Sequence, residues 1–220
     1  MKHDLRIEKG LETKKRIMEC AKSAFQNNGY KNATIVEITQ AAGVPIGLFT
    51  YYFKTKSNIV THVHFDYLQR IRAELELFDW IKDETPLFIG SVENYIYYKN
   101  IFDSAEVSRF YLEVLYGDLQ ENFIYETDKT RFEEYIKYYN IDITDDELEI
   151  LLTFINGGKK NLIIKYFENT LKVDKDDVLN FIVFNDINLT KASDGEKTRV
   201  KDKILSRAPG IDLSGIAMLN

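Results

Sequence analysis

Residues Thr34 to Lys56 read T-I-V-E-I-T-Q-A-A-G-V-P-I-G-L-F-T-Y-Y-F-K-T-K, and this stretch decides the fold of the N-terminal region. Thr34 is followed three residues later by Glu37, which is the capping-box pattern of a helix start. Gly43 suits the end of that helix. Pro45 suits the first turn of the next helix, because the amide hydrogen that proline lacks has no partner there.

The side chains around this turn fit two helices that cross at a steep angle. Small Ala41 and Ala42 allow close approach, and Val44 fills the angle between the helices. An amphipathic helix is predicted over 13–27, before the pair. Its apolar face holds Ile17, Ala21, Ala24 and Phe25. Together these features predict a helix-turn-helix, which presents its second helix to a DNA groove.

The stretch from about 13 to 60, about a fifth of the chain, resembles the DNA-binding domain of the TetR family. The resemblance joins capping, turn and aromatic positions over one continuous stretch. The matching residues are Phe25, Gly29, Tyr30, Thr34, Ile38, Ala42, Gly43, Val44, Gly47, Phe49, Tyr52, Phe53, Thr55 and Lys56. This resemblance implies a dimeric bacterial transcriptional regulator with a helical C-terminal body that binds a small ligand.

Resemblance and physical chemistry together assign roles on the DNA. Thr34 and Lys56, each at a helix N-terminus, are expected to hold phosphates on either side of the groove, and Tyr52 to donate its hydroxyl to phosphate. Thr50 and Tyr51 are expected to reach base edges. The predicted DNA-binding set is Thr34, Pro45, Ile46, Gly47, Leu48, Thr50, Tyr51, Tyr52 and Lys56.

The chain departs from the family pattern on its reading helix. The family often has Ser or Thr at position 45, polar or basic residues at 46 and 48, and Tyr at 50; here these are Pro45, Ile46, Leu48 and Thr50. The helix offers no Arg, Asn or Gln, so specificity is expected from methyl contacts, DNA shape and a few hydroxyls. The alternative is that these apolar residues form a contact surface for something other than DNA.

The rest of the chain reads as helical throughout, which predicts an all-α protein. Prolines stand only at 45, 86 and 209, and no segment alternates with period two. Further helices are expected over about 55–80, 87–98, 104–125, 128–139, 145–171 and 175–190. The predicted organisation is a helix-turn-helix domain over 1–56, a ligand-binding and dimerisation domain over 57–192, and a weakly ordered tail over 193–220.

Aromatic residues are dense between about 78 and 125, and a cavity between helices that is lined by aromatic side chains suits a small organic ligand. The alternative is an ordinary aromatic core. The predicted ligand-pocket residues are Trp80, Phe88, Tyr95, Tyr98, Phe102, Phe110, Tyr111 and Tyr116.

The last two predicted helices are broadly apolar, and Gly157 and Gly158 within the first of them suggest that another helix crosses closely. In TetR-like proteins such a pair forms a four-helix dimer interface; a pair buried within one chain is the alternative. The predicted interface residues are Leu148, Leu152, Ile155, Gly158, Leu162, Tyr166, Val178, Phe181 and Ile182. In this scheme the ligand tilts the helix that starts at Thr55, and the two heads of the dimer then no longer match the spacing of the DNA half-sites.

Composition narrows the function further. Residues 1–64 carry a net charge of about +5, although the whole chain carries −6, so a basic head sits on an acidic body. No apolar run is long enough for a membrane span, no signal peptide is evident, and Cys20 is the only cysteine, which predicts a cytoplasmic protein. No nucleotide-binding, hydrolase or zinc motif occurs, so we expect no catalytic residue, no cofactor and no metal.

The sequence therefore predicts a sequence-specific DNA-binding regulator, a repressor that a small-molecule effector releases from a palindromic operator. Two other functions stay open at this point. In the first, the chain binds DNA but its body recruits another protein instead of a ligand. In the second, the chain is a helical adaptor that has lost DNA binding. An enclosed cavity in the body distinguishes ligand sensing from the first, and DNA binding excludes the second.

Overall fold

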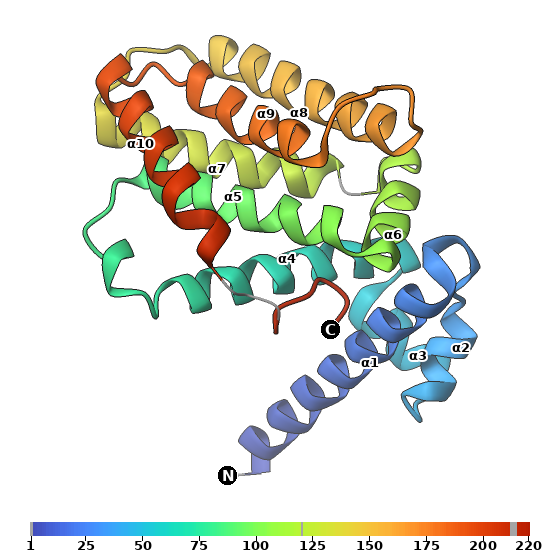
Figure 1. Cartoon of the computed structure of the whole chain (residues 1–220). Helices are drawn as coiled ribbons and strands as arrows, with labels where there is room; N and C mark the ends of the chain where they lie inside the picture. The colour runs from blue at the N-terminus through green and yellow to red at the C-terminus, as the bar shows by residue number, and fades with distance from the viewer. Residues whose placement is uncertain (1, 120, 212–214) are drawn as a thin grey trace.

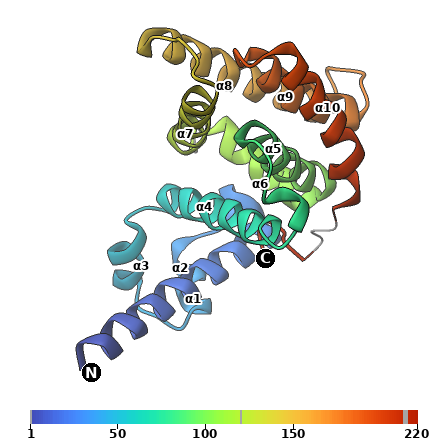
Figure 2. The same cartoon turned by 90° about the vertical axis from the view of Figure 1, so that its left-hand side faces the viewer.

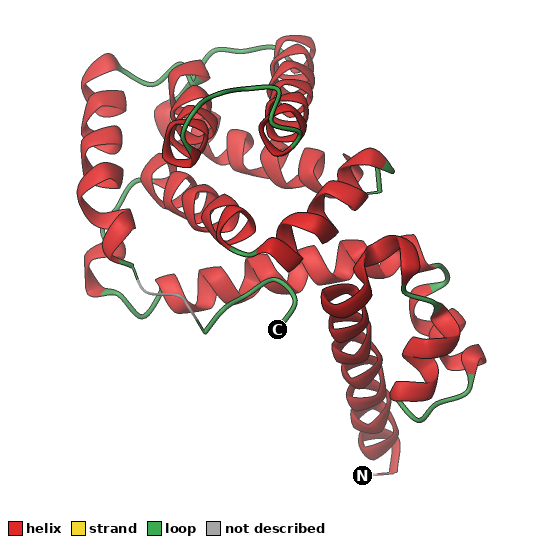
Figure 3. Ribbon diagram, turned by 45° about the vertical axis from the view of Figure 1, so that its right-hand side comes forward, coloured by secondary structure: helices red, strands yellow, loops and turns green. Residues whose placement is uncertain are grey.

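The computed structural model describes residues 2–119, 121–211 and 215–220, and within them it contains ten α-helices and no strand (Figures 1 and 3). The prediction of an all-α protein is confirmed. The helices are α1 (Lys2–Asn32), α2 (Ile35–Ala41), α3 (Ile46–Phe53), α4 (Lys56–Leu75), α5 (Pro86–Asp103), α6 (Ala105–Tyr116), α7 (Glu121–Tyr139), α8 (Asp145–Phe167), α9 (Lys175–Leu189) and α10 (Asp194–Arg207). None of the described helices is long and apolar enough to cross a membrane.

Helices α1, α2 and α3 form a small N-terminal head below the larger body (Figure 2). The hydroxyl of Thr34 accepts a hydrogen bond from the amide of Glu37 at 3.1 Å, as predicted for the start of α2. The Glu37 carboxylate, however, accepts from the side-chain amide of Asn28 at 2.7 Å. The carboxylate thus ties the start of α2 to the end of α1.

Helix α1 is longer than the predicted 13–27, because it begins at Lys2 and continues to Asn32. Gly29 interrupts its helical backbone with φ 76° and ψ 170°. A glycine is needed there for a second reason, since a Cβ atom at this position would lie 2.8 Å from a carboxylate oxygen of Glu113. The C-terminal end of α1 therefore leaves room for the side chain of Glu113 from α6.

The predicted helix over 104–125 is wrong, because the chain turns between α6 and α7. Asp118 has φ 53°, and the amide of Leu119 donates to the carbonyl of Val114 at 3.2 Å. This bond spans five residues, as in the Schellman motif that ends many helices. Likewise α4 ends at Leu75, before Trp80, and a short 3-10 turn follows over Asp79–Ile81.

The boundary predicted between residues 56 and 57 coincides with the first turn of α4. Helix α4 packs on α1 and α3 in the head and on α5 and α7 in the body. Ile59, Val60 and Val63 on this helix are fully buried. Because one continuous helix belongs to both cores, the domain boundary itself stays a prediction.

A network of buried charges crosses the centre of the body. The ammonium of Lys159 on α8 lies 3.1 Å from Asp128 on α7 and 2.6 Å from Asp186 on α9. Arg131 on α7 lies 2.8 Å from the same Asp128. Burial acts to lower the pKa of Lys159, but the two carboxylates outweigh it and raise that pKa above its ordinary value.

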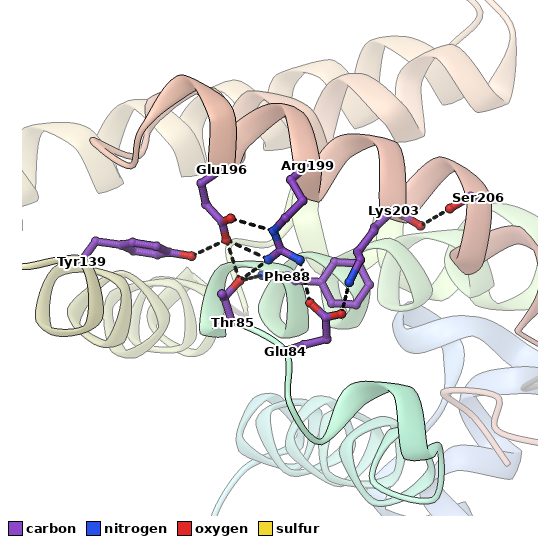
Figure 4. A network of polar contacts seen from close by, with 8 residues as sticks. All are labelled: Glu84, Thr85, Phe88, Tyr139, Glu196, Arg199, Lys203 and Ser206. Carbon is purple, nitrogen blue, oxygen red and sulfur yellow. Dashed lines mark hydrogen bonds and ion pairs between the residues drawn. The ribbon is translucent and has the colours of Figure 1, made fainter.

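The prediction of a weakly ordered tail over 193–220 is wrong for 194–211 and 215–220; residues 212–214 lie outside the described residues. Helix α10 packs on α5 and α9, with Val200 and Ile204 fully buried. A polar network holds its first turns (Figure 4). In it Arg199 donates to Glu84 at 3.0 Å, Tyr139 donates to Glu196 at 2.8 Å, and Lys203 pairs with Glu84.

After α10 the chain returns toward the head, as Figure 1 shows by the position of its C-terminal end beside α1. Met218 and Leu219 are buried, and the carbonyl of Ala217 accepts from Arg70 of α4 at 3.0 Å. The carbonyl of Asn220 accepts from Lys22 of α1 at 2.9 Å. Residues 216–220 thus join the end of the chain to both α1 and α4.

Replacing Met218 with alanine tests the order of this segment. We expect Met218→Ala to lower the free energy of unfolding by about 2–5 kcal/mol, because the side chain is fully buried. Asn220→Ala is the control, because its side chain is exposed and its backbone carbonyl is kept. Chemical denaturation measures both, and equal small effects would mean that the segment does not pack.

A second substitution tests the buried charges. Lys159→Met removes the cation between Asp128 and Asp186, and we expect it to lower the free energy of unfolding by about 3–5 kcal/mol. Lys160→Met on the same helix is the control, because its ion pair with Asp118 lies at the surface and is worth about 1 kcal/mol at most. Equal losses in the two variants would contradict this assignment.

Candidate functional site

Helix α3 separates its residues into a buried and an exposed face. Phe49 and Phe53 are buried and anchor the helix in the head. Tyr51 is 76% exposed and Ile46 is 50% exposed, and Thr50 is exposed beside them. The two buried phenylalanines therefore fix the direction in which the opposite face points.

Six of the nine predicted DNA-binding residues lie exposed around the start of α2 and on α3. We call this surface the reading face. It consists of Thr34, Pro45, Ile46, Gly47, Thr50 and Tyr51. Leu48 departs from this group, because it is half-buried and packs against the core. Tyr52 is also half-buried, and its hydroxyl lies beside Gly10 of α1.

Lys56 differs most from its predicted role. Its ammonium donates to the backbone carbonyls of Tyr30 at 2.7 Å and Ala33 at 2.8 Å. It also lies 4.3 Å from the centre of the Tyr30 ring, and burial lowers the pKa of Lys56. The cation thus closes the end of α1 onto the start of α4. In this geometry the ammonium joins the two helices, and its predicted contact with phosphate stays a prediction.

The structure adds exposed residues that the sequence interpretation left out. Val36 is 49% exposed on α2, and Gln40 on the same helix is exposed. Helix α1 extends beyond α2 and α3 and carries the exposed cations Lys9, Lys15 and Arg16 (Figure 1). The excess of positive charge in 1–64 was the available signal for the latter group.

The body contains a cavity of about 530 Å³ between α5, α6, α7 and α8. Its size lies in the range of small-molecule sites. Its lining residues are Tyr98, Tyr111, Leu115, Asp118, Ile124, Tyr125, Glu126, Glu149, Thr153, Asn156, Gly157, Lys159, Lys160 and Ile163. A second hollow, of about 330 Å³, lies between α7, α8 and α9 beside the exposed Ile150 and Phe154.

Only Tyr98 and Tyr111 of the eight predicted pocket residues line the cavity of about 530 Å³. Trp80 and Phe88 pack edge to face against each other away from it, and Phe102 stacks on Phe167. Phe110 is fully buried against the head.

Tyr95 is buried outside the cavity, and Tyr116 is half exposed with its hydroxyl on Glu168. Phe102 lines a separate open hollow of about 680 Å³ beside α6 and Phe167. For the other five residues the alternative of core or surface packing fits the structure, because an aromatic-rich sequence does not show which rings leave space between them.

The predicted dimer interface needs a similar correction. Five of its residues are buried within one chain, where no second chain can reach them: Leu148, Leu152, Ile155, Val178 and Ile182. Gly158 is exposed, Phe181 is 62% exposed, and Leu162 and Tyr166 are half-buried. The outward apolar side chains that the prediction missed are Ile150 and Phe154, which are 70% and 66% exposed.

Helix α6 connects the cavity of about 530 Å³ to the head. Tyr111 and Leu115 line the cavity, while Phe110 stacks on Phe25 of α1 at 5.1 Å between ring centres. From the same helix, Arg109 donates to the carbonyl of Asn27 at 3.1 Å. Glu113 accepts from the backbone amide of Lys31 at 2.7 Å. A displacement of α6 therefore acts directly on the end of α1.

A second connection runs through His64 on α4. Its ring lies between Tyr111 and Tyr97, with a 2.6 Å hydrogen bond between its Nδ1 atom and the Tyr97 hydroxyl. Burial lowers the pKa of His64 to about 3, so the ring is neutral. Tyr111 of the cavity wall thus contacts α4 through the ring of His64. Its neighbour Phe110 contacts α1 through the ring of Phe25.

Comparison with known proteins places the head. Residues 17–63 match the family described as bacterial regulatory proteins, tetR family. The uncharacterized HTH-type transcriptional regulator YdgC of Bacillus subtilis (strain 168) is 33% identical over 68 residues, which cover 31% of this chain. The match spans only 35% of the length of YdgC.

Solved structures share the whole fold at low identity. RolR in complex with resorcinol is 16% identical, with a TM-score of 0.61 over 90% of this chain and 96% of RolR. TylP, a TetR regulator of Streptomyces fradiae, is 15% identical, with a TM-score of 0.55 over 92% of this chain and 94% of TylP. A gamma-butyrolactone receptor described as ArpA-like is 13% identical, with a TM-score of 0.51 over 92% of this chain and all of the receptor. Residues 17–63 therefore match the DNA-binding region of the tetR family of bacterial regulatory proteins, and the solved structures show that the chain as a whole shares their fold.

Proposed function

We propose that the chain is a dimeric transcriptional regulator that binds double-stranded DNA through the reading face and is released by a small molecule in the body. The observation that carries the proposal is the reading face itself. Its exposed Thr50 and Tyr51 lie on a helix that buried Phe49 and Phe53 hold in place, within the residues that match the family. The chain then acts by binding, as a cytoplasmic repressor, and not by catalysis.

The exposed chemistry of α3 suits a thymine-rich contact. Ile46 and the methyl group of Thr50 present apolar surface, which favours contact with the C5-methyl groups of thymine. Thr34 at the N-terminus of α2 supplies a hydroxyl close to free backbone amides, which favour phosphate. With so few donors on α3, DNA shape contributes part of the specificity.

A second copy of the chain is the partner that we propose for the outer face of α8 and α9. This face exposes Ile150, Phe154 and Phe181, and monomeric proteins rarely leave such neighbouring apolar side chains in water. At Gly158, which lies outside the cavity lining, a Cβ atom would meet nothing within 4 Å. The backbone is therefore accessible to a closely packed helix of the second copy, and a two-fold dimer fits a palindromic operator.

The cavity of about 530 Å³ is the proposed effector site. Helix α6 supports this choice, because it lines the cavity with Tyr111 and Leu115 and holds the end of α1 with Arg109 and Glu113. An effector changes DNA affinity only if it binds one arrangement of the heads more tightly than the other. The resorcinol in RolR and the description of another neighbour as a gamma-butyrolactone receptor fit a body of this kind.

The cavity also bears on the alternative of a body that recruits a protein. A protein partner needs a flat or grooved surface, whereas this cavity is bounded by four helices and includes buried Tyr98 and Tyr111. The site therefore favours a small effector. The outer face of α8 and α9 is apolar enough for a protein partner, and a second copy meets that need.

The experiment that tests DNA binding begins with the selection of tight-binding duplexes from a random-sequence library by the full chain. We expect an enriched palindrome, and a steep fall of affinity with salt because phosphate contacts release counterions. We expect Tyr51→Ala to weaken binding of the selected duplex about tenfold or more, with unchanged thermal stability, since the side chain is 76% exposed.

Tyr138→Ala is the matched control, because Tyr138 is also an exposed tyrosine, on α7 of the body. It should leave the affinity for DNA unchanged. Full affinity in Tyr51→Ala, or no enrichment of any duplex, would contradict the proposed DNA-binding function.

A further inference from the structure

We propose that the effector cavity takes an organic cation, an ammonium or amidinium group carried on a flat apolar body. This inference rests on the proposed function in that it concerns the same cavity, and it adds the chemical class of the effector. It depends on three features of the lining: aromatic and apolar inner walls, cations that are already neutralised, and hydrogen-bond acceptors that lack a donor.

The inner walls suit a flat apolar body. Tyr98 and Tyr111 are buried in the chain and line the cavity together with Leu115, Ile124 and Ile163. Tyrosine faces attract cations, because the π-system of a ring is negative on its face. The walls thus bind the apolar part of a ligand by contact and tolerate a positive charge above the rings.

The two cations of the lining are already paired. Lys159 lies within 3.1 Å of Asp128 and 2.6 Å of Asp186, and all three side chains are buried. Lys160 pairs with Asp118 at the mouth. An anionic ligand that paired with Lys159 would leave Asp128 or Asp186 buried without its cation, which is costly. The cavity therefore disfavours carboxylates and phosphates.

The carboxylates Glu126 and Glu149 have no such balance. Within the described part of the chain, no lysine or arginine lies within ion-pair distance of either. Glu149 accepts a hydrogen bond from the Tyr125 hydroxyl, which raises the pKa of Tyr125 to about 12 and keeps that partner neutral. Two exposed carboxylates thus stand at the rim of the cavity without an ion pair to a described lysine or arginine.

Asn156 adds a buried acceptor. Its side-chain nitrogen donates to the carbonyl of Leu152 at 2.9 Å, which sets the orientation of the amide. Its Oδ1 atom is buried and has no donor among the described residues. An N–H group of the ligand satisfies this oxygen, whereas a ligand that only accepts hydrogen bonds does not. This buried acceptor without a donor points to the same ligand class as the charges.

Three matched probes test the inference on the full chain: 2-naphthylmethylammonium, neutral 2-naphthylmethanol and anionic 2-naphthoate. Isothermal titration at neutral pH and low salt measures their affinities. We expect the cation to bind about tenfold more tightly than the alcohol, and the anion to bind most weakly. Equal affinities, tighter binding of the alcohol or the anion, or no binding of the cation would overturn the inference.

Charge-removing variants locate the site. The double variant Glu126→Gln/Glu149→Gln should bring the affinity for the cation down to that for the alcohol, with the alcohol unaffected. The control is Glu133→Gln/Glu134→Gln, which removes two exposed carboxylates of α7 that lie outside the cavity lining. An unchanged preference for the cation in the first double variant would also overturn the inference.

The same preparation separates this inference from the proposed function. Affinity for the selected duplex is measured with and without saturating 2-naphthylmethylammonium. Selective cation binding that leaves DNA affinity unchanged supports the ligand class and contradicts release by the effector. DNA binding that persists with no preference among the probes contradicts the ligand class alone.

Discussion

The packing of α6 against α1 joins the head to the body. Phe110 stacks on Phe25, and Glu113 holds the amide of Lys31 beside a glycine that has no side chain to obstruct it. The head meets the body through this contact and through the start of α4. Since α6 also forms a wall of the cavity, the head and the cavity are not independent.

The head was predictable from the sequence because its signals are local. The hydroxyl of Thr34 caps α2, and a turn follows at Gly43. The buried Phe49 and Phe53, four residues apart, then define the inner face of α3, all within about twenty residues. Lys56 shows the limit of such reasoning. Its place in the motif indicated a phosphate contact, but its ammonium is held by carbonyls of residues more than twenty positions earlier. No local pattern reports such a distant partner.

The body was predictable as helical but not in its details. The aromatic residues between 78 and 125 were evident, yet only tertiary packing decides that Tyr98 and Tyr111 line a cavity while Phe110 fills the space beside the head. The inward and outward faces of α8 were likewise misjudged, because Leu152 and Phe154 are equally apolar in sequence and opposite in exposure. Helix α10 was missed because its sequence is mostly polar, and ion pairs such as Arg199 with Glu84 hold it in place.

We propose that the cavity and the reading face are coupled through α6, and a cavity-filling substitution tests this coupling without a known effector. Leu115 lies on α6 and lines the cavity, so Leu115→Trp places additional volume where an effector would bind. The volume-conserving Leu115→Met is the control. The measurement is the affinity of each folded dimer for the selected duplex. We expect an affinity several-fold weaker in Leu115→Trp than in Leu115→Met. Equal affinities in two variants of equal dimer content would contradict the coupling.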